Sequence, residues 1–279
     1  MKRQKVTLTI REDLLKRVDE IIDNTRIRNR SHAIEYLLNE ALKPKVKKAY
    51  ILAGGEGVRM RPFTHEIPKA LLPVKGKPIL EYQIDLLKNA EIREIFILVG
   101  HLGEKIKYHF GDGSRFGVKI SYLEQKKKTI GTGYALYLAK NFFLKETFLV
   151  LYGDELIEIN LKDFIDFHLS SGGIATLALS SIEKPSLTFY GVAKLRGKKI
   201  VEFLEKPQEE KGISQVLNAG VFCFEPKIFD YLLPKTNLSL ENDIFPRLAK
   251  EGKLCGYLFE GKWFDVGTPE IYARAIKEW

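Results

Sequence analysis

A glycine-rich turn followed by an arginine is the first feature of the chain whose residue types and spacing suit chemistry. The apolar run 49–53 leads directly into 54–57 (GGEG), and Arg59 follows two residues later. Glycines let the backbone approach an anion and present N–H groups to it, and an arginine supplies a cation suited to phosphate. No Gly-Lys-Ser/Thr follows, so the turn is not a Walker loop, and the third glycine of a dinucleotide fingerprint is misplaced. On its own, such a turn also fits a purely structural role.

Two more charged residues stand where phosphate chemistry would need them. Lys69 lies between the prolines of 68–74 (PKALLPV), ten residues after Arg59. Asp154 follows the apolar run 148–152, so we expect it at the carboxyl end of a strand, where open α/β sheets bind their ligands. A carboxylate there suits Mg²⁺, which takes one or two carboxylates together with phosphate oxygens and waters.

The elements that must position these residues follow an alternating pattern. Strand-like apolar runs lie at 49–53, 95–99, 120–123, 147–152 and 174–179, and helical segments lie at 79–89, 104–110, 132–144 and 161–169. This alternation predicts an α/β fold with a mostly parallel, Rossmann-like sheet covered by helices. Hairpin-like patterns around 191–204 and 256–263 predict an antiparallel extension of that sheet.

Two motifs together resemble the signature of the sugar-1-phosphate nucleotidylyltransferases, also called NDP-sugar pyrophosphorylases. They are LAGGxGxRxxP at 52–62 and PKxLLPV at 68–74. The resemblance runs from about residue 48 to the C-terminus through GTG at 131–133, YGD at 152–154, YGV at 190–192, EKP at 205–207, NAG at 218–220 and WFDVGTP at 263–269. It implies that a nucleoside triphosphate (dTTP, UTP or GTP) transfers its nucleotidyl group to a hexose-1-phosphate of the glucose or mannose type. Pyrophosphate is the other product, and Mg²⁺ is the implied cofactor.

The same resemblance assigns roles to individual residues. It implies catalytic roles for Arg59, Lys69 and Asp154, with Mg²⁺ held by Asp154 and Asp265. The implied nucleotide-binding residues are Leu52, Ala53, Gly54, Gly55, Gly57, Gln125, Gly131 and Thr132. The implied sugar-phosphate-binding residues are Tyr190, Gly191, Glu205, Lys206 and Asn218. The chain departs from the commoner pattern at Val58, usually threonine, and in the segment 125–131, which is one residue longer. The longer segment leaves the choice of base open, whereas the change at Val58 is milder.

The first sixth of the chain has a different composition. Residues 1–48 hold 13 Lys and Arg against 7 Asp and Glu, so they carry +6 of the total net charge of +9. Residues 6–10 (VTLTI) alternate as a half-buried strand does, and two amphipathic segments follow, 11–24 and a helix that we expect to begin at Ser31. A strand and two helices in about 40 residues cannot bury that much apolar surface alone, which favours a homodimer.

This N-terminal pattern resembles a ribbon-helix-helix domain, a β-α-α fold that we assign to residues 1–44, with a linker at 45–48 and the transferase domain at 49–279. The resemblance implies that Lys5, Thr7 and Thr9 read bases in the major groove of duplex DNA. Arg30 and the amides near Ser31 would then hold phosphate. The alternative is a dimerisation module whose basic residues are merely solvated. Both interpretations make the protein at least a dimer.

Composition excludes several other classes. No apolar run reaches the roughly 18 residues that a membrane helix needs, and the first ten residues do not resemble a signal peptide. Cys223 and Cys255 have no metal-binding or disulfide spacing, so we expect a cytoplasmic protein. Abundant Lys, Glu and Ile are typical of thermophilic proteins. A DNA-binding regulator that uses the transferase fold as a sugar-nucleotide sensor, or an enzyme that also represses its own synthesis, remains the alternative.

Overall fold

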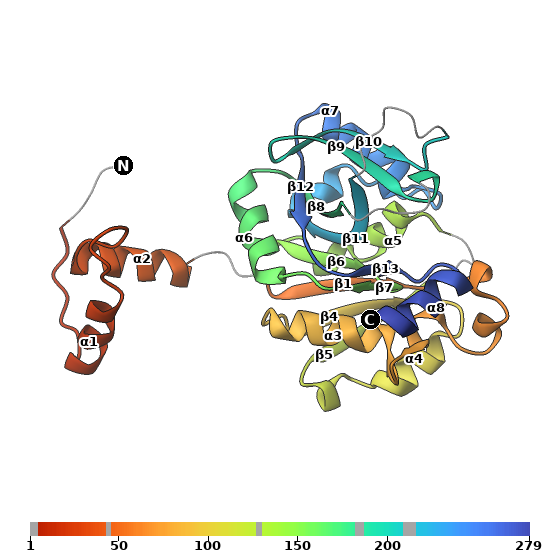
Figure 1. The fold of residues 1–279 in the computed structure, drawn as a ribbon, viewed down its shortest axis with the longest axis horizontal. Helices are drawn as coiled ribbons and strands as arrows, with labels where there is room; N and C mark the ends of the chain where they lie inside the picture. Colours follow the sequence, from red (N-terminus) through yellow and green to blue (C-terminus); the bar gives the residue numbers. More distant parts are fainter. Residues whose placement is uncertain (1–4, 43–45, 127–129, 182–186, 209–215) are drawn as a thin grey trace. The chain divides into compact units, whose positions relative to one another are not determined.

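The computed structural model describes residues 5–42, 46–126, 130–181, 187–208 and 216–279 (Figure 1). The chain forms two compact units, Met1–Lys45 and Val46–Trp279. The predicted linker 45–48 therefore begins outside the described residues, and its last residue, Lys48, already starts the first strand of the large unit. Among the described helices, none combines the length and the apolar character needed to cross a membrane.

Within its described residues 5–42, the N-terminal unit contains two helices, α1 (Glu12–Glu20) and α2 (Arg30–Leu42). Asp23 holds the connection between them, because its Oδ1 accepts hydrogen bonds from the backbone N–H groups of three residues at 2.8–2.9 Å, namely Thr25, Arg26 and Ile27. These bonds, those of Ile27 and Thr25 above all, lower the pKa of Asp23 to about 2. The turn is therefore built around an ionised carboxylate.

One prediction for this unit is wrong in detail, and another concerns a paired strand that a single chain does not test. The described residues 5–10 form no strand in the single chain, and Val6 and Leu8 are 68% and 56% exposed. A strand needs a neighbour for its backbone hydrogen bonds, and no described segment of this unit supplies one. The second helix begins at Arg30 rather than Ser31, since the side chain of Asn29 accepts the N–H of His32 at 2.9 Å and caps the helix.

The large unit is built on a nine-stranded sheet in the order β5-β4-β1-β6-β11-β8-β12-β10-β9. Its strands are β1 (Lys48–Ala53), β4 (Glu94–Val99), β5 (Lys119–Glu124), β6 (Phe148–Tyr152), β8 (Ala175–Ser180), β9 (Gly191–Arg196), β10 (Lys199–Glu205), β11 (Leu217–Phe224) and β12 (Leu254–Phe259). Strands β5, β4, β1 and β6 are parallel neighbours, and β11 runs antiparallel to β6 and β8. The predicted α/β fold with antiparallel strands added to a parallel core is thus confirmed, but the sheet is mixed rather than mostly parallel, because four of the eight neighbouring pairs in this order are antiparallel.

Short strands and helices complete the unit. Two small sheets pair β2 (Pro73–Val74) with β3 (Lys77–Pro78) and β7 (Glu155–Ile157) with β13 (Trp263–Asp265). The helices are α3 (Ile79–Asn89), α4 (Gly103–Phe110), α5 (Thr132–Leu138), α6 (Leu161–Ser171), α7 (Phe245–Lys250) and α8 (Pro269–Glu278). The predicted hairpin at 191–204 is present as β9–β10. The one predicted at 256–263 is wrong, because β12 pairs with β8 and β10 whereas β13 pairs with β7.

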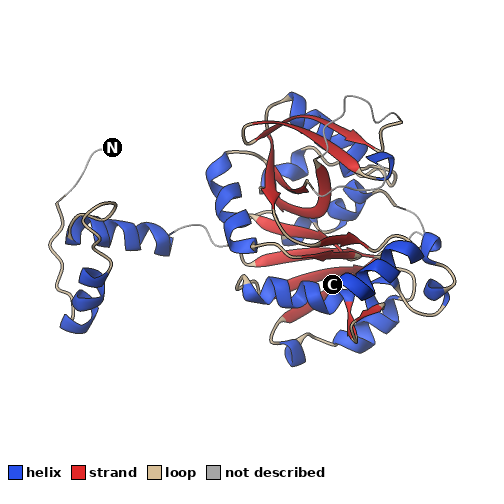
Figure 2. Ribbon diagram, in the orientation of Figure 1, coloured by secondary structure: helices blue, strands red, loops and turns tan. Residues whose placement is uncertain are grey.

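Helices cover both faces of the large sheet (Figure 2). Apolar residues of α3, α4 and α6 pack on one face, and those of α5 and α7 pack on the other. A third cluster joins Met60, fully buried, to Phe264 and Tyr272. This cluster anchors the segment that carries Arg59 against the C-terminal elements β13 and α8.

Candidate active site

The glycine-rich turn leaves β1 at the carboxyl edge of the sheet. Gly57 adopts φ +62°, a left-handed conformation that favours glycine, and a Cβ there would lie 2.9 Å from Cγ2 of Thr64. The hydroxyl of Thr64 donates to the carbonyl of Gly57 at 2.7 Å. Immediately after it, the 3₁₀ turn η1 (Val58–Met60) buries Met60 and carries Arg59 into a cavity of about 350 Å³. The turn therefore has the geometry that delivers an arginine to a ligand.

The predicted nucleotide-binding residues on β1 and β5 meet beside this turn. A Cβ on Gly54 would lie 2.5 Å from Oε1 of Gln125, so the two residues are in direct contact. The backbone N–H of Gln125 donates to the carbonyl of Val99 at the end of β4, at 2.8 Å. Gly153 packs closely on Leu52 and Ala53 and donates to the carbonyl of Leu52 at 3.0 Å. Residues far apart in sequence are thereby joined along one sheet edge.

Lys69 and the two aspartates form the charged centre. The ammonium of Lys69 donates to Oδ2 of Asp154, and both side chains are largely buried. Burial opposes the charge of Lys69, but Asp154 and then Asp265 outweigh it, so the pKa of Lys69 is raised. Lys69 is thus a fixed cation beside two carboxylates.

A small sheet brings the two aspartates together although 110 intervening residues separate them. In the β7–β13 pair, Asp265 lies opposite Glu155, and the N–H of Val266 donates to the carbonyl of Asp154 at 3.0 Å. A Cβ on Gly267 would lie 3.1 Å from both Nη2 of Arg59 and Oδ1 of Asp265, so these charged groups converge on Gly267.

This donor set fits a magnesium ion. Mg²⁺ needs one or two protein carboxylates and takes its other ligands from phosphate and water, and Asp154 and Asp265 supply two hard oxygen donors. The described residues hold no cluster of three or more His, Cys, Asp or Glu side chains suited to a metal, so an all-protein cage is not available in that part of the chain. The site suits an ion that arrives with a phosphorylated ligand.

Two supporting residues were missed by the sequence analysis. Nε2 of Gln83, on the buried face of α3, donates to the carbonyls of Tyr152 and Glu155 at 2.7 and 2.8 Å and so clamps the backbone on both sides of Asp154. The buried Glu155 accepts the indole N–H of Trp263 at 2.7 Å. Burial, reinforced by Asp265 and Asp154, raises the pKa of Glu155 well above its ordinary value. Neither residue belongs to a recognisable motif.

The predicted sugar-phosphate residues line the same cavity as Arg59. The lining includes Tyr190, Gly191, Glu205, Lys206 and Asn218, together with Gly131, Thr132, Asp154 and Asp265. Gly191 lies against the carboxylate of Glu205, since a Cβ there would be 2.9 Å from Oε2. The ammonium of Lys206 lies 3.2 Å from Oε1 of Glu205. Leu52, Ala53, Gly54, Gly55, Gly57, Lys69 and Gln125 do not line this cavity.

Another carboxylate of the cavity, Glu241, was also missed. It lies in a π-helical turn, η8 (Leu240–Ile244), and is 8% exposed. Its carboxylate accepts hydrogen bonds from the hydroxyls of Tyr152, of Thr132 at 2.6 Å and of Ser239 at 2.8 Å. Burial and then the charge of Glu241, which lines the same cavity, raise the pKa of Glu205.

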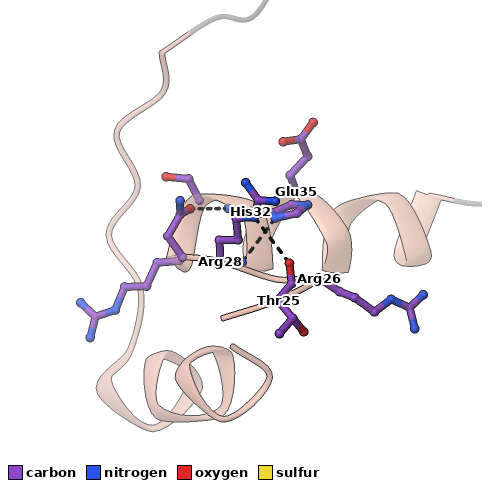
Figure 3. Close-up of a pocket in the computed structure, with 8 residues that line it drawn as sticks. Thr25, Arg26, Arg28, His32 and Glu35 are labelled. Atoms are coloured by element: carbon purple, nitrogen blue, oxygen red, sulfur yellow. Dashed lines mark hydrogen bonds between the residues drawn. The ribbon is translucent and has the colours of Figure 1, made fainter. Parts of the chain in front are cut away.

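The N-terminal unit has its own open, basic pocket of about 740 Å³ at the start of α2. Figure 3 shows Thr25, Arg26, Arg28, His32 and Glu35 around it. The predicted DNA-contacting residues Lys5, Thr7, Thr9 and Ser31 are all exposed. The guanidinium of Arg30, however, is bound by both carboxylate oxygens of Asp19, at 2.7 and 2.8 Å.

The fold and site define the class of the large unit. It is an open α/β sheet with a glycine-rich turn after β1 and Asp154 after β6, beside which other elements place Arg59, Lys69 and Asp265, an arrangement suited to phosphorylated ligands. The profile of the nucleotidyl transferase family matches residues 48–279, and the chain belongs to this family.

Relatives with assigned activities cover most of the chain. It is 35% identical over 242 residues to a UTP–glucose-1-phosphate uridylyltransferase of Synechocystis, covering 82% of this chain and 62% of the relative. It is 35% identical over 234 residues to the mannose-1-phosphate guanylyltransferase catalytic subunit beta of Danio rerio, covering 82% of this chain and 63% of the relative. The chain thus spans about three-fifths of the length of these curated relatives.

A solved structure from Bacillus anthracis, described as a glucose-1-phosphate thymidylyltransferase, superposes with a TM-score of 0.75 at 32% identity. The match covers 82% of this chain and 94% of that one.

Proposed function

We propose that the large unit transfers a nucleotidyl group from dTTP, UTP or GTP to a hexose-1-phosphate of the glucose or mannose type, in a reaction that requires Mg²⁺. The observation that carries this proposal is the convergence of Arg59, Lys69, Asp154 and Asp265 beside a cavity lined by Glu205 and Lys206. The same activity class in the relatives of Synechocystis and Danio rerio supports it.

The chemistry is a displacement at phosphorus between two anions. A sugar-1-phosphate oxygen attacks the α-phosphorus, the new P–O bond forms, and the bond to pyrophosphate breaks. Mutual repulsion is the main obstacle, so the protein must position the reactants and neutralise their charge. A magnesium ion held by Asp154 and Asp265 would supply charge neutralisation at the reacting phosphates.

The residues of this chain bind the reactants and stabilise their charge. Arg59 holds the triphosphate and the departing pyrophosphate, and Lys69 stabilises negative charge near the α-phosphate. Lys206 binds the phosphate of the sugar, and Glu205 accepts hydrogen bonds from sugar hydroxyls. Gln125 and the backbone near Gly131 contact the base. None of these groups needs to form a covalent intermediate.

Pyrophosphate release, measured across a grid of nucleoside triphosphates and sugar-1-phosphates with Mg²⁺, tests the proposal. We expect turnover with at least one pair, and Asp154→Asn should lower kcat about 10³-fold or more. The matched control is Asp230→Asn, at an exposed aspartate outside the cavity, which should retain wild-type turnover. No turnover with any pair would contradict the enzymatic proposal and favour a sugar-nucleotide sensor.

For the N-terminal unit we propose a ribbon-helix-helix dimer that binds duplex DNA. Its described residues expose a large apolar surface: Val6, Leu8, Leu14, Tyr36, Leu37 and Leu38 are all 38–68% exposed. Apolar exposure of this kind on a small unit is typical of an interface. Pairing of residues 6–10 with their copies would satisfy the backbone of that segment and bury Val6 and Leu8. The basic pocket in Figure 3 supports a polyanionic partner.

Sedimentation and fluorescence anisotropy separate the DNA-binding dimer from a simple dimerisation module. Deleting residues 1–44 should lower the oligomeric state and remove salt-dependent binding of labelled duplex DNA, while pyrophosphate release persists. Lys5→Ala with Thr7→Ala should weaken DNA binding without dissociating the dimer. Dimerisation without DNA binding by the intact chain would leave only the dimerisation module.

A further inference from the structure

Glu241 lines the cavity, yet the reaction proposed above assigns it no role. The turn that carries Glu241 is held in place by hydrogen bonds. Ser239 caps this π-helical turn, because its hydroxyl accepts the N–H of Asn242 at 3.1 Å. Single π-helical turns are rare and occur frequently at functional sites. The main-chain N–H of Leu240 donates to the hydroxyl of Thr132 at 2.9 Å, which directs the hydrogen of that hydroxyl to Glu241.

The hydrogen bonds of Glu241 leave one acceptor position for a ligand. A carboxylate offers about four lone-pair positions. Oε2 accepts from Thr132 and Ser239, whereas Oε1 accepts from Tyr152. One position of Oε1 remains on a side chain that is more than nine-tenths buried and lines the cavity. A ligand that fills it must bring a hydrogen-bond donor.

Charge indicates which part of the ligand lies there. Glu205 and Glu241 line the same cavity, and carboxylates repel phosphate, so phosphate groups belong near the cations Arg59, Lys69 and Lys206. The group beside Glu241 must therefore be a neutral donor, and a sugar ring offers several hydroxyl donors. The base has its own candidate contacts at Gln125 and Gly54, outside the cavity lining, and at the backbone near Gly131, which lines the cavity.

We propose that Glu241 is a sugar-recognition residue, whose Oε1 accepts a hydrogen bond from one ring hydroxyl of the hexose opposite Glu205. This inference rests on the proposed sugar-1-phosphate substrate. It adds a specificity determinant from the C-terminal half of the fold. Because Thr132 starts α5 directly after Gly131, the same carboxylate links the sugar to the segment predicted to bind the nucleotide.

The assignment is tested by combining a substitution at Glu241 with deoxy analogues of the sugar. Calorimetry would give the Kd of α-D-glucose 1-phosphate, α-D-mannose 1-phosphate and their 2-, 3-, 4- and 6-deoxy analogues for the wild type and for Glu241→Gln. We expect the substitution to weaken binding of the parent sugar about 10- to 100-fold, the range of a hydrogen bond to a charged group. For one deoxy analogue, which lacks the contacted hydroxyl, the substitution should cause little further loss.

Controls separate recognition from structural support. Thr132→Val removes a donor to Glu241 and should weaken all the sugars by one common factor, whereas Glu251→Gln, at a glutamate outside the cavity, should leave their binding unchanged. If Glu241→Gln does not fold, Glu241→Asp carries the same cycle, because the shortened carboxylate cannot reach both its donors and the sugar.

Each remaining outcome has a definite meaning. An equal loss for every deoxy analogue would overturn the assignment and leave Glu241 as a support for Thr132 and Tyr152. A loss that appears in nucleoside triphosphate binding instead would place the contact on the base and also overturn it. Failure of the wild type to bind any of the sugars would overturn it as well. Sugar binding without pyrophosphate release would contradict only the proposed reaction.

Discussion

The ion pair between Lys69 and Asp154 yields a quantitative prediction for Lys69→Met. Methionine is one atom shorter than lysine and carries no charge, so the substitution leaves Asp154 without its ion-pair partner and removes a cation that also interacts with Asp265 and Glu155. Loss of one partner from a fully buried ion pair costs about 3–5 kcal/mol. Lys69 and Asp154 are 17% and 26% exposed, so we expect solvent to reduce this to about 2–3 kcal/mol. For a domain of this size that corresponds to a decrease of roughly 4–12 °C in Tm.

The assay is urea or thermal unfolding of the full chain without Mg²⁺, completed as a double-mutant cycle with Asp154→Asn. The free energy of unfolding of the double variant should be at least about 1 kcal/mol higher than the sum of the two single effects predicts, because the double variant holds no unpaired partner. Mg²⁺ should raise the Tm of Lys69→Met more than that of the wild type, since the metal replaces the missing cation. Pyrophosphate release should fall about 10³-fold in Lys69→Met whether or not Mg²⁺ restores stability. Additive single effects would refute the energetic coupling between the two residues.

Two other perturbations follow from the contacts described above. Gly131→Ala places a Cβ 2.1 Å from the carbonyl oxygen of Leu238, so urea unfolding should show that the free energy of unfolding falls by about 1–3 kcal/mol. The KM for the triphosphate should rise, because Gly131 is a candidate nucleotide contact. An unchanged KM would contradict the link between the segment of Gly131 and that of Leu238. Asp23 has its pKa lowered from 3.8 to about 2, so it stabilises the N-terminal turn above pH 4 and this contribution disappears as the pH falls toward 2. Carboxyl NMR resonances should report that titration, and a midpoint near 3.8 would disprove the turn geometry.

Much of the large unit could be predicted from sequence because its signals are local. The helix at 79–89 coincides with α3, and the apolar runs coincide with the parallel strands to within about two residues. The hairpin predicted at 256–263 was wrong because β12 and β13 are both apolar strands. An alternation with a period of two cannot reveal whether a strand pairs with its neighbour in sequence or with a distant strand. The strand at 6–10 stays a prediction for the dimer, because alternation predicts a strand face but a strand also requires a partner.

The residues of the site also fall into two groups: those that sequence motifs indicate and those that only the fold reveals. Arg59, Lys69, Asp154, Glu205 and Lys206 stand in short motifs whose glycines and prolines constrain the backbone, so the sequence alone was enough to nominate them. Gln83, Glu155 and Glu241 stand in no motif, and each acquires its role from partners 69 to 109 residues away. Their burial and their hydrogen bonds exist only once β7 meets β13 and the η8 turn meets α5, because desolvation and directional bonding depend on the completed packing. Local motifs therefore nominated the candidate charges of the site, and tertiary structure alone decided which buried groups hold them in position.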